Sequence, residues 1–244
     1  MYVDPTNIGD IVFESPGEAL KISLIANGQI NFPYAGKTGI LLHGVPGTGK
    51  TTLAAIMPPL IEACQPNGGN ILDVQQHKCI VGKNGVEFIQ SIQNQLSLIP
   101  ISPGSGIRYI ILDEVDNLTP QARTQLKSVM EMDNAVFLLT TNNLHLLEPA
   151  LRSRCLEVSF NPTNPKIWLS RLHGILATQG VSAATFSNVF LENLVSNEKF
   201  DARGILLHLK MVILQRQQNN TVIPVATAVP PETQQQQQPS PTTP

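Results

Sequence analysis

The stretch "GILLHGVPGTGKTTLAAI", residues 39–56, decides the fold because it joins an apolar run, a glycine-rich loop and a helix-forming segment. The apolar run is short and rich in Ile and Leu, which is typical of a strand buried in a parallel sheet. The loop fits the pattern G-x-x-x-x-G-K-[ST] from Gly44 to Thr51. Glycines let the backbone curl so that successive N–H groups point at one anion, and the helix that begins near Lys50 adds its positive end. The stretch therefore predicts a phosphate-binding loop.

A nucleotide in this loop would be held by charge, by a hydroxyl and by backbone N–H groups. Lys50 supplies a compact positive charge to the β and γ phosphates, and the Thr51 hydroxyl is a ligand for Mg²⁺. The alternative is a glycine-rich turn that fits the pattern by chance, but its position between a strand and a helix favours phosphate binding. The predicted ATP-binding residues of the loop are Gly44, Val45, Pro46, Gly47, Thr48, Gly49, Lys50, Thr51 and Thr52.

Further apolar runs alternate with helical segments along the next hundred residues. The predicted strands are residues 39–44, 70–74, 108–114, 135–142 and 155–160, and the predicted helices are residues 50–63, 86–98 and 120–132. Thr119 is a good N-cap for the last helix, with Pro120 in its first position. Strands that alternate with helices predict an α/β fold with a doubly wound parallel sheet, which binds ligands at the carboxyl ends of its strands.

Two segments of different character follow residue 160. Apolar residues at helical spacing, without a strand pattern, predict a small helical lid domain over residues 161–217. Residues 218–244 are rich in Pro, Thr and Gln and nearly uncharged, so we expect a disordered tail. The predicted ATPase domain is thus residues 1–160.

Polar side chains that could act on a nucleotide follow two of the strands. Asp113 ends the "IILDE" strand, where its carboxylate can reach Mg²⁺, and Glu114 can then orient and deprotonate an attacking water. The strand "AVFLLTTN" ends in amides, of which Asn142 is the better candidate to hold the water and the γ-phosphate. Asn143 fits a turn equally well, and taken alone the whole "TTNN" stretch reads more readily as a turn.

Composition excludes several classes of protein. The 244 residues have a formal net charge of −2 and only 14% charged residues, so the surface is not a uniform polycation. The three cysteines lack zinc or disulfide spacing, which favours buried thiols and a reducing compartment. We find neither a signal peptide nor a membrane-spanning apolar stretch, so we expect an intracellular protein, cytoplasmic in a bacterium or in the host of a phage.

In combination these motifs resemble the AAA+ ATPase subunits of sliding-clamp loaders, such as replication factor C small subunits and their phage and bacterial relatives. The resemblance covers roughly residues 2–210. "LLHGVPGTGKTT" resembles Walker A, "YIILDEVDNLTPQARTQLKSVME" Walker B, "LLTTNN" sensor 1 and "FDARGILLHLK" sensor 2. The signature Ser153-Arg154-Cys155, in register with the other motifs, favours this family over other P-loop ATPases.

The resemblance implies further roles. Backbone around Val12, in the opening "YVDPTNIGDIVF", would flank the adenine, and Arg203 of the sensor 2 segment would lie over the phosphates. Arg154 would be an arginine finger that acts in trans on the site of a neighbouring subunit. Lys83 lies where the family has DNA-binding residues, although a solvated loop lysine is an equally good interpretation. The implied cofactors are ATP and Mg²⁺, and the implied partners are other clamp-loader subunits, the sliding clamp and primer–template DNA.

Two departures and two alternatives stand beside this interpretation. Asp4 replaces the usual arginine of the opening motif, and we expect no third, helical collar domain, which normally holds the pentamer together. Without a collar, the same motifs would suit a helicase loader or a replication-initiation ATPase of a phage or plasmid. A non-hydrolysing scaffold subunit is a further alternative, although the intact Lys50, Thr51, Asp113 and Glu114 weigh against it.

Overall fold

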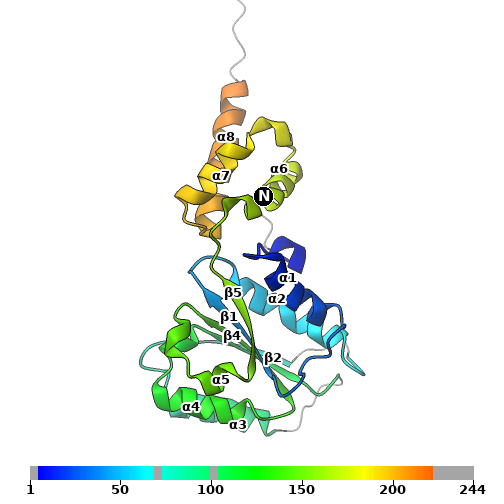
Figure 1. The fold of residues 1–244 in the computed structure, drawn as a ribbon, viewed down its shortest axis with the longest axis vertical. Helices are drawn as coiled ribbons and strands as arrows, with labels where there is room; N and C mark the ends of the chain where they lie inside the picture. The colour runs from blue at the N-terminus through cyan, green and yellow to red at the C-terminus, as the bar shows by residue number, and fades with distance from the viewer. Residues whose placement is uncertain (1–4, 69–72, 99–103, 222–244) are drawn as a thin grey trace, which may run out of the picture.

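A computed structural model describes residues 5–68, 73–98 and 104–221 of the chain. Its centre is a parallel sheet of five strands in the order β2-β3-β4-β1-β5 (Figure 1). The strands are β1 (Gly39–Gly44), β2 (Asp73–Lys78), β3 (Arg108–Asp113), β4 (Ala135–Thr141) and β5 (Cys155–Phe160). The loop after β1 therefore leaves from the interior of the sheet, between β4 and β5. The predicted doubly wound parallel sheet is confirmed.

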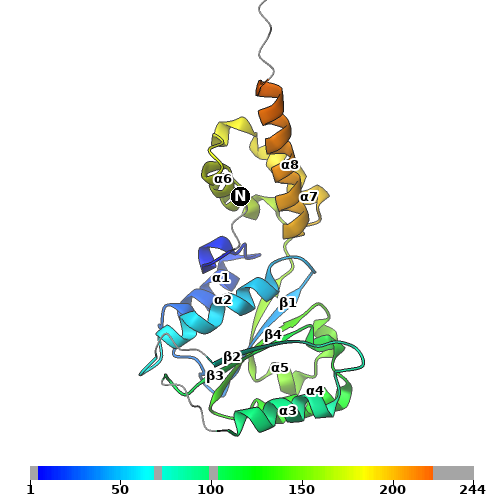
Figure 2. The same cartoon turned by 180° about the vertical axis from the view of Figure 1, so that it is seen from behind.

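Helices cover both faces of the sheet because successive strand residues point to opposite sides. Ile40 and Leu42 of β1 pack with α1 (Pro16–Ala26) and α2 (Lys50–Ala63) in one hydrophobic cluster. Leu41 belongs to the cluster on the other face, with α3 (Val86–Leu96), α4 (Pro120–Val129) and α5 (Pro149–Arg152). Figure 2 shows α1 and α2 on one side of the sheet and α3 and α4 on the other.

Capping residues explain where several helices begin. The Thr119 hydroxyl accepts a hydrogen bond from the Ala122 N–H at 3.2 Å, and Pro120 is the first residue of α4, as predicted. Helix α1 was not predicted, although Ser15 and Glu18 form the spacing of a capping box before it. The Ser15 hydroxyl accepts from the Glu18 N–H, and Pro16 follows the cap.

The predicted second strand is placed wrongly. Strand β2 is Asp73–Lys78, so it begins near the end of the expected residues 70–74, of which 70–72 lie outside the described residues. Its sequence, DVQQHK, is polar because β2 is an edge strand that pairs only with β3 and has alternating exposure. Smaller differences concern helix ends, since α3 ends at Leu96 and α4 at Val129.

The residues after β5 form only helices in the part of the chain that the structure describes. They are a 3₁₀ turn (Pro165–Trp168), α6 (Leu169–Thr178), a second 3₁₀ turn (Ala183–Thr185), α7 (Asn188–Asn197) and α8 (Ala202–Thr221). These helices pack around their own cluster, which includes Trp168, Leu172, Leu191, Ile205 and Leu209. They lie beyond the end of the sheet from which β5 leaves (Figure 1).

Helix α8 continues to Thr221, past the expected start of the tail at residue 218. The residues just before this point, Gln215 to Gln218, have good helix propensity, and the helix that they form runs on through the last three residues, of which Asn and Thr are weaker helix formers. The remaining tail, residues 222–244, lies outside the described residues. Among the described helices, none combines the length and the apolar character that a bilayer crossing requires.

Replacing Leu41 by Ala should lower the free energy of unfolding by about 2–5 kcal/mol, because its fully buried side chain would leave a cavity at the centre of the sheet. Urea unfolding followed by circular dichroism measures the change. Leu20→Ala is the matched control, since Leu20 is 57% exposed and its loss should change stability by less than about 0.5 kcal/mol. Equal effects of the two variants would contradict the placement of β1 in the core.

Candidate nucleotide site

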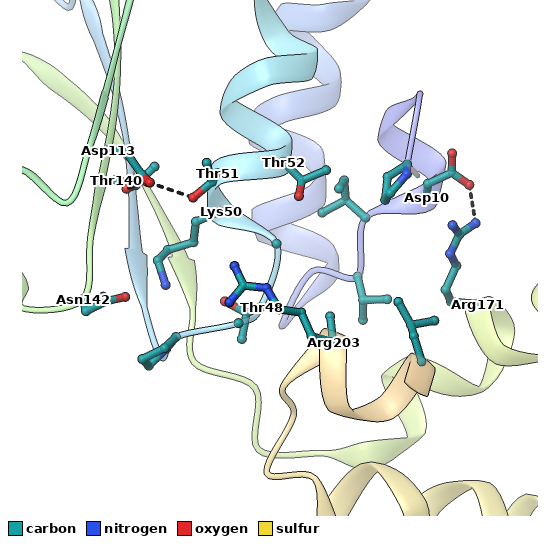
Figure 3. A pocket seen from close by; sticks show the side chains of 18 of the residues that line it. Asp10, Thr48, Lys50, Thr51, Thr52, Asp113, Thr140, Asn142, Arg171 and Arg203 are labelled. Atoms are coloured by element: carbon teal, nitrogen blue, oxygen red, sulfur yellow. Dashed lines mark hydrogen bonds and ion pairs between the residues drawn. The ribbon is translucent and has the colours of Figure 1, made fainter. Parts of the chain in front are cut away.

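A cavity of about 680 Å³ opens at the carboxyl ends of the strands (Figure 3). Four parts of the chain line it: the N-terminal segment, the glycine-rich loop with the start of α2, the ends of β2, β3 and β4, and the helices after β5. It brings together most of the predicted site, namely Val12, Pro46, Gly47, Thr48, Gly49, Lys50, Thr51, Thr52, Asp113, Glu114, Asn142 and Arg203.

The glycine-rich loop has the backbone that its sequence demands. Gly44 has a φ of +136°, and a Cβ there would collide with the Phe160 carbonyl of the neighbouring strand. The Val45 N–H donates to that same carbonyl at 3.1 Å, which fixes the entry of the loop against β5. Gly44 and Val45 do not line the cavity themselves but reach the site through their carbonyls, as described next.

Lys50 lies inside the loop and is only 6% exposed. Its Nζ donates to the carbonyls of Gly44 at 2.9 Å and Val45 at 2.7 Å. Burial lowers the pKa of this ammonium to about 8, against the opposing attraction of Asp113 and Asp116. The site thus holds the Lys50 ammonium in a poorly solvated place, where a bound phosphate would stabilise its charged form.

The two predicted magnesium ligands are in contact. The Thr51 hydroxyl donates to Asp113 Oδ1 at 2.8 Å, and the Thr140 hydroxyl donates to the same oxygen at 2.5 Å. Hydroxyl and carboxylate oxygens are the donors that Mg²⁺ prefers, and it usually takes one or two carboxylates with the rest of its shell from phosphates and water. The residues therefore fit Mg²⁺, although the described residues contain no cluster of three acidic, His or Cys ligands.

Glu114 is held in an unusual backbone conformation with both carboxylate oxygens occupied. Its φ is +59°, in the left-handed region that non-glycine residues seldom adopt, and its N–H donates to the Thr140 hydroxyl at 3.0 Å. Lys78 Nζ lies 3.1 Å from one carboxylate oxygen, and Asn117 Nδ2 donates to the other at 3.2 Å. Each oxygen keeps a second lone pair, so these two contacts orient the carboxylate and leave it able to accept a proton from water.

The geometry separates the two neighbouring amides. Asn142 lines the cavity, whereas the Asn143 side chain donates to Asp116 Oδ2 at 2.7 Å outside the cavity lining. Asn142 is therefore the amide in a position to contact a nucleotide, as expected.

Two predicted site residues lie away from the cavity. Arg154 precedes β5, so it is at the amino end of the sheet, where its guanidinium pairs with Glu131 and donates to the Ala150 carbonyl at 2.8 Å. Lys83 lies in the turn between β2 and α3, where its N–H donates to the Ile80 carbonyl. Neither residue can act on a ligand bound in this cavity of the same chain.

Other cavity residues were missed. Lys78 was not predicted because β2 was misplaced. Thr140 was not predicted because the interpretation of "TTNN" rested on its two amides. Trp168, Arg171, Leu206 and Lys210 come from the helices after β5, where the prediction rested on apolar spacing and on Arg203 of the sensor 2 segment. Such lining residues have no motif, because they meet the site only through the packing of the helices.

Comparison with known proteins identifies the family. Residues 40–163, about half of the chain, match the model of the ATPase family associated with various cellular activities (AAA). The chain belongs to the AAA family of ATPases. This family consists of ATPases, so the cavity at the glycine-rich loop is the candidate nucleotide site.

The curated relatives agree with the resemblance to clamp-loader subunits. Replication factor C subunit 5 of Mus musculus is 27% identical over 70% of this chain and 50% of its own length. Replication factor C subunit 3 of Blastobotrys adeninivorans is 28% identical over 68% of this chain and 48% of its own length. DNA polymerase III subunit gamma/tau of Mycoplasma pneumoniae is 26% identical over 83% of this chain and 31% of its own length. The chain spans about half the length of the replication factor C relatives that it matches.

A solved structure confirms the fold. The RuvB Holliday junction branch migration motor of Thermotoga maritima superimposes with a TM-score of 0.64 at 17% identity, over 89% of this chain and 67% of that one. This similarity extends past the sheet into the helices that follow β5.

ATP affinity should fall about tenfold between pH 7 and pH 9. With a pKa of about 8, the charged form of Lys50 drops from about nine tenths to about one tenth over this range, and the triphosphate needs the charged form. Titration calorimetry at the two pH values measures the effect. In Lys50→Arg the guanidinium stays charged, so its affinity, although lower, should not change with pH. Equal wild-type affinities at pH 7 and pH 9 would contradict the argument.

Proposed function

We propose that this chain is an ATP-hydrolysing subunit of a sliding-clamp loader, which opens a DNA polymerase processivity clamp and places it on primed DNA. One observation carries the proposal: the cavity gathers every predicted catalytic group except Arg154, which lies at the opposite end of the sheet. A site that lacks its arginine in one copy and presents that arginine elsewhere is suited to an assembly in which subunits complete each other. The similarity to replication factor C subunits supports the same proposal.

Within one chain, the described side chains divide the work. Lys50 and the loop N–H groups bind the phosphates of ATP, and Thr51 with Asp113 holds Mg²⁺. When bound, the metal neutralises charge on the β and γ phosphates. Glu114, whose carboxylate is oriented by Lys78 and Asn117, accepts a proton from the attacking water, and Asn142 orients that water.

Arg203 connects nucleotide state to the lid. It is the second residue of α8 and lines the cavity, so a guanidinium–phosphate contact would pull α8 towards the loop. The Ala202 N–H already donates to the Gly47 carbonyl at 2.9 Å, which brings the start of α8 against the loop. We infer that residues 161–217 act as the lid of an ATPase domain formed by residues 1–160, and that phosphate release changes the angle between them.

DNA would be held through its backbone in the assembled subunits. A net charge of −2 means that the surface is not a uniform polycation, so a few basic side chains would make the contacts. Lys83, in the turn between β2 and α3, is the candidate in this chain.

The test of the proposed function is ATP hydrolysis measured with primed DNA, with and without the cognate clamp. We expect slow hydrolysis by the isolated chain and stimulation when other loader subunits, clamp and DNA are present together. Stimulation by a replicative helicase without any effect of a clamp would instead show a helicase loader or initiation ATPase. Tight ATP binding without hydrolysis under every condition would show a scaffold subunit.

Replacing Arg154 by Ala should keep ATP binding and lower stimulated turnover about a thousandfold, which is the usual contribution of an arginine finger. Arg152→Ala is the matched control, because Arg152 is two residues away and pairs with Glu157 at 3.0 Å outside the cavity. Calorimetry measures binding, and phosphate release in the assembled loader measures turnover. A collapse of ATP binding in Arg154→Ala would contradict the role in trans.

A further inference from the structure

An ion pair forms part of the cavity wall at the end away from Lys50 and Asp113. The Arg171 guanidinium of α6 pairs with Asp10 Oδ1, and the two side chains are 21% and 20% exposed. Figure 3 shows this pair on one side of the glycine-rich loop and Asp113 with Asn142 on the other. Both partners line the cavity, so the pair is part of its wall.

Asp10 also holds its own segment together. Its second oxygen accepts from the Thr6 N–H at 3.1 Å, and Asp10 ends the 3₁₀ turn Ile8–Asp10, after which the Ile11 N–H donates to the Ile8 carbonyl. A single carboxylate therefore shapes the N-terminal segment and binds a helix that lies 161 residues further along the chain.

The two residues after Asp10 belong to different parts of the fold. Ile11 is buried in the cluster between the sheet and the helices α1 and α2, whereas Val12 packs against the cluster of the helices after β5. Ile11 and Val12 both line the cavity. The segment is thus fixed to the sheet by Ile11 and to the helices by Val12, and Arg171 adds an ion pair to these contacts.

We propose that Asp10 and Arg171 are a pair of positioning residues that hold residues 10–12 and helix α6 in the geometry that receives the nucleoside end of the ligand. The proposal rests on the proposed function, because it assumes that the ligand is ATP. Lys50, Thr51 and Asp113 fix the triphosphate at the loop, so the rest of the molecule must extend along the wall that carries the pair.

The pair should therefore affect one half of the ligand and not the other. Because the pair is mostly removed from solvent, its loss leaves two poorly solvated charges that can relax only if the segment and α6 move apart. That movement would displace Ile11, Val12 and Trp168 from the nucleoside. The phosphate contacts come from α2, β3 and the loop, which do not depend on the pair.

The experiment compares ATP with inorganic tripolyphosphate as ligands of the whole chain, by calorimetry in the presence of Mg²⁺. Asp10→Asn keeps an oxygen that can accept from Thr6, and Arg171→Gln keeps a polar side chain, so both variants remove mainly the ion pair. Each should weaken ATP binding about tenfold and leave the affinity for tripolyphosphate unchanged. The double variant should be no worse than either single one, because the two residues act as a unit. Arg171→Lys should restore most of the affinity.

Glu157→Gln is the matched control, since it removes the Arg152–Glu157 ion pair by the same chemical change outside the cavity lining. Its ATP affinity should equal that of the wild type. Emission from Trp168, the single tryptophan of the chain and part of the cavity wall, gives a second readout, which should respond to ATP less in Asp10→Asn than in the wild type.

Two results would overturn the inference. Unchanged ATP affinity in both single variants would show that the pair does not position the segment. Equal weakening of ATP and tripolyphosphate would show a general structural role. A wild-type chain that binds neither ligand, or that binds ATP no more tightly than tripolyphosphate, would contradict the proposed function. This result is distinguishable from the other two because it is seen before any substitution is made.

Discussion

The site depends on the parallel pairing of β1, β4 and β3. In this register His43 lies beside Thr141, and Leu112 beside Leu139, so the three strands end at the same edge of the sheet. Three groups leave from that edge: Lys50 in the loop, the carboxylate of Asp113 and the hydroxyl of Thr140. They meet there because the ends of the three strands are neighbours in the sheet. The hydrogen bonds of Thr51 and Thr140 to one oxygen of Asp113 are the direct result.

The parallel pairing of β5 with β1 places Arg154 at the amino end of the sheet, opposite the cavity. The Thr38 and Gly39 N–H groups donate to the Arg154 carbonyl, and Lys37 Nζ donates to the carbonyls on either side of it, those of Ser153 and Cys155. The backbone of Arg154 is thus fixed to the residues that lead into β1, the strand that ends at the glycine-rich loop. One strand therefore joins the glycine-rich loop to the end of the sheet that carries Arg154, and in the proposed assembly it would be a rigid path between successive sites.

Patterns in neighbouring residues made the centre of the fold predictable. Strands β1 and β5 and helix α2 have the expected bounds because an apolar run and a glycine-rich loop each act within a few residues. Strand β2 was placed wrongly because an edge strand in solvent carries no apolar signal. Two ion pairs were not predicted, because charged residues far apart in the sequence leave no periodic pattern: Asp10–Arg171 and Lys78–Glu114. The phosphate side of the site could thus be read from motifs, whereas its nucleoside side exists only after the helices pack.

The polar character of β2 has a consequence for how copies meet. An edge strand offers unpaired N–H and C=O groups to any other strand, and short length and hydrophilic side chains discourage such sheet extension. Because β2 has six residues, all but Val74 polar or charged, its exposed margin is a poor template for growth of a continuous sheet. In the proposed assembly, this would direct the contacts between subunits to loops and helix surfaces rather than to the edge of the sheet.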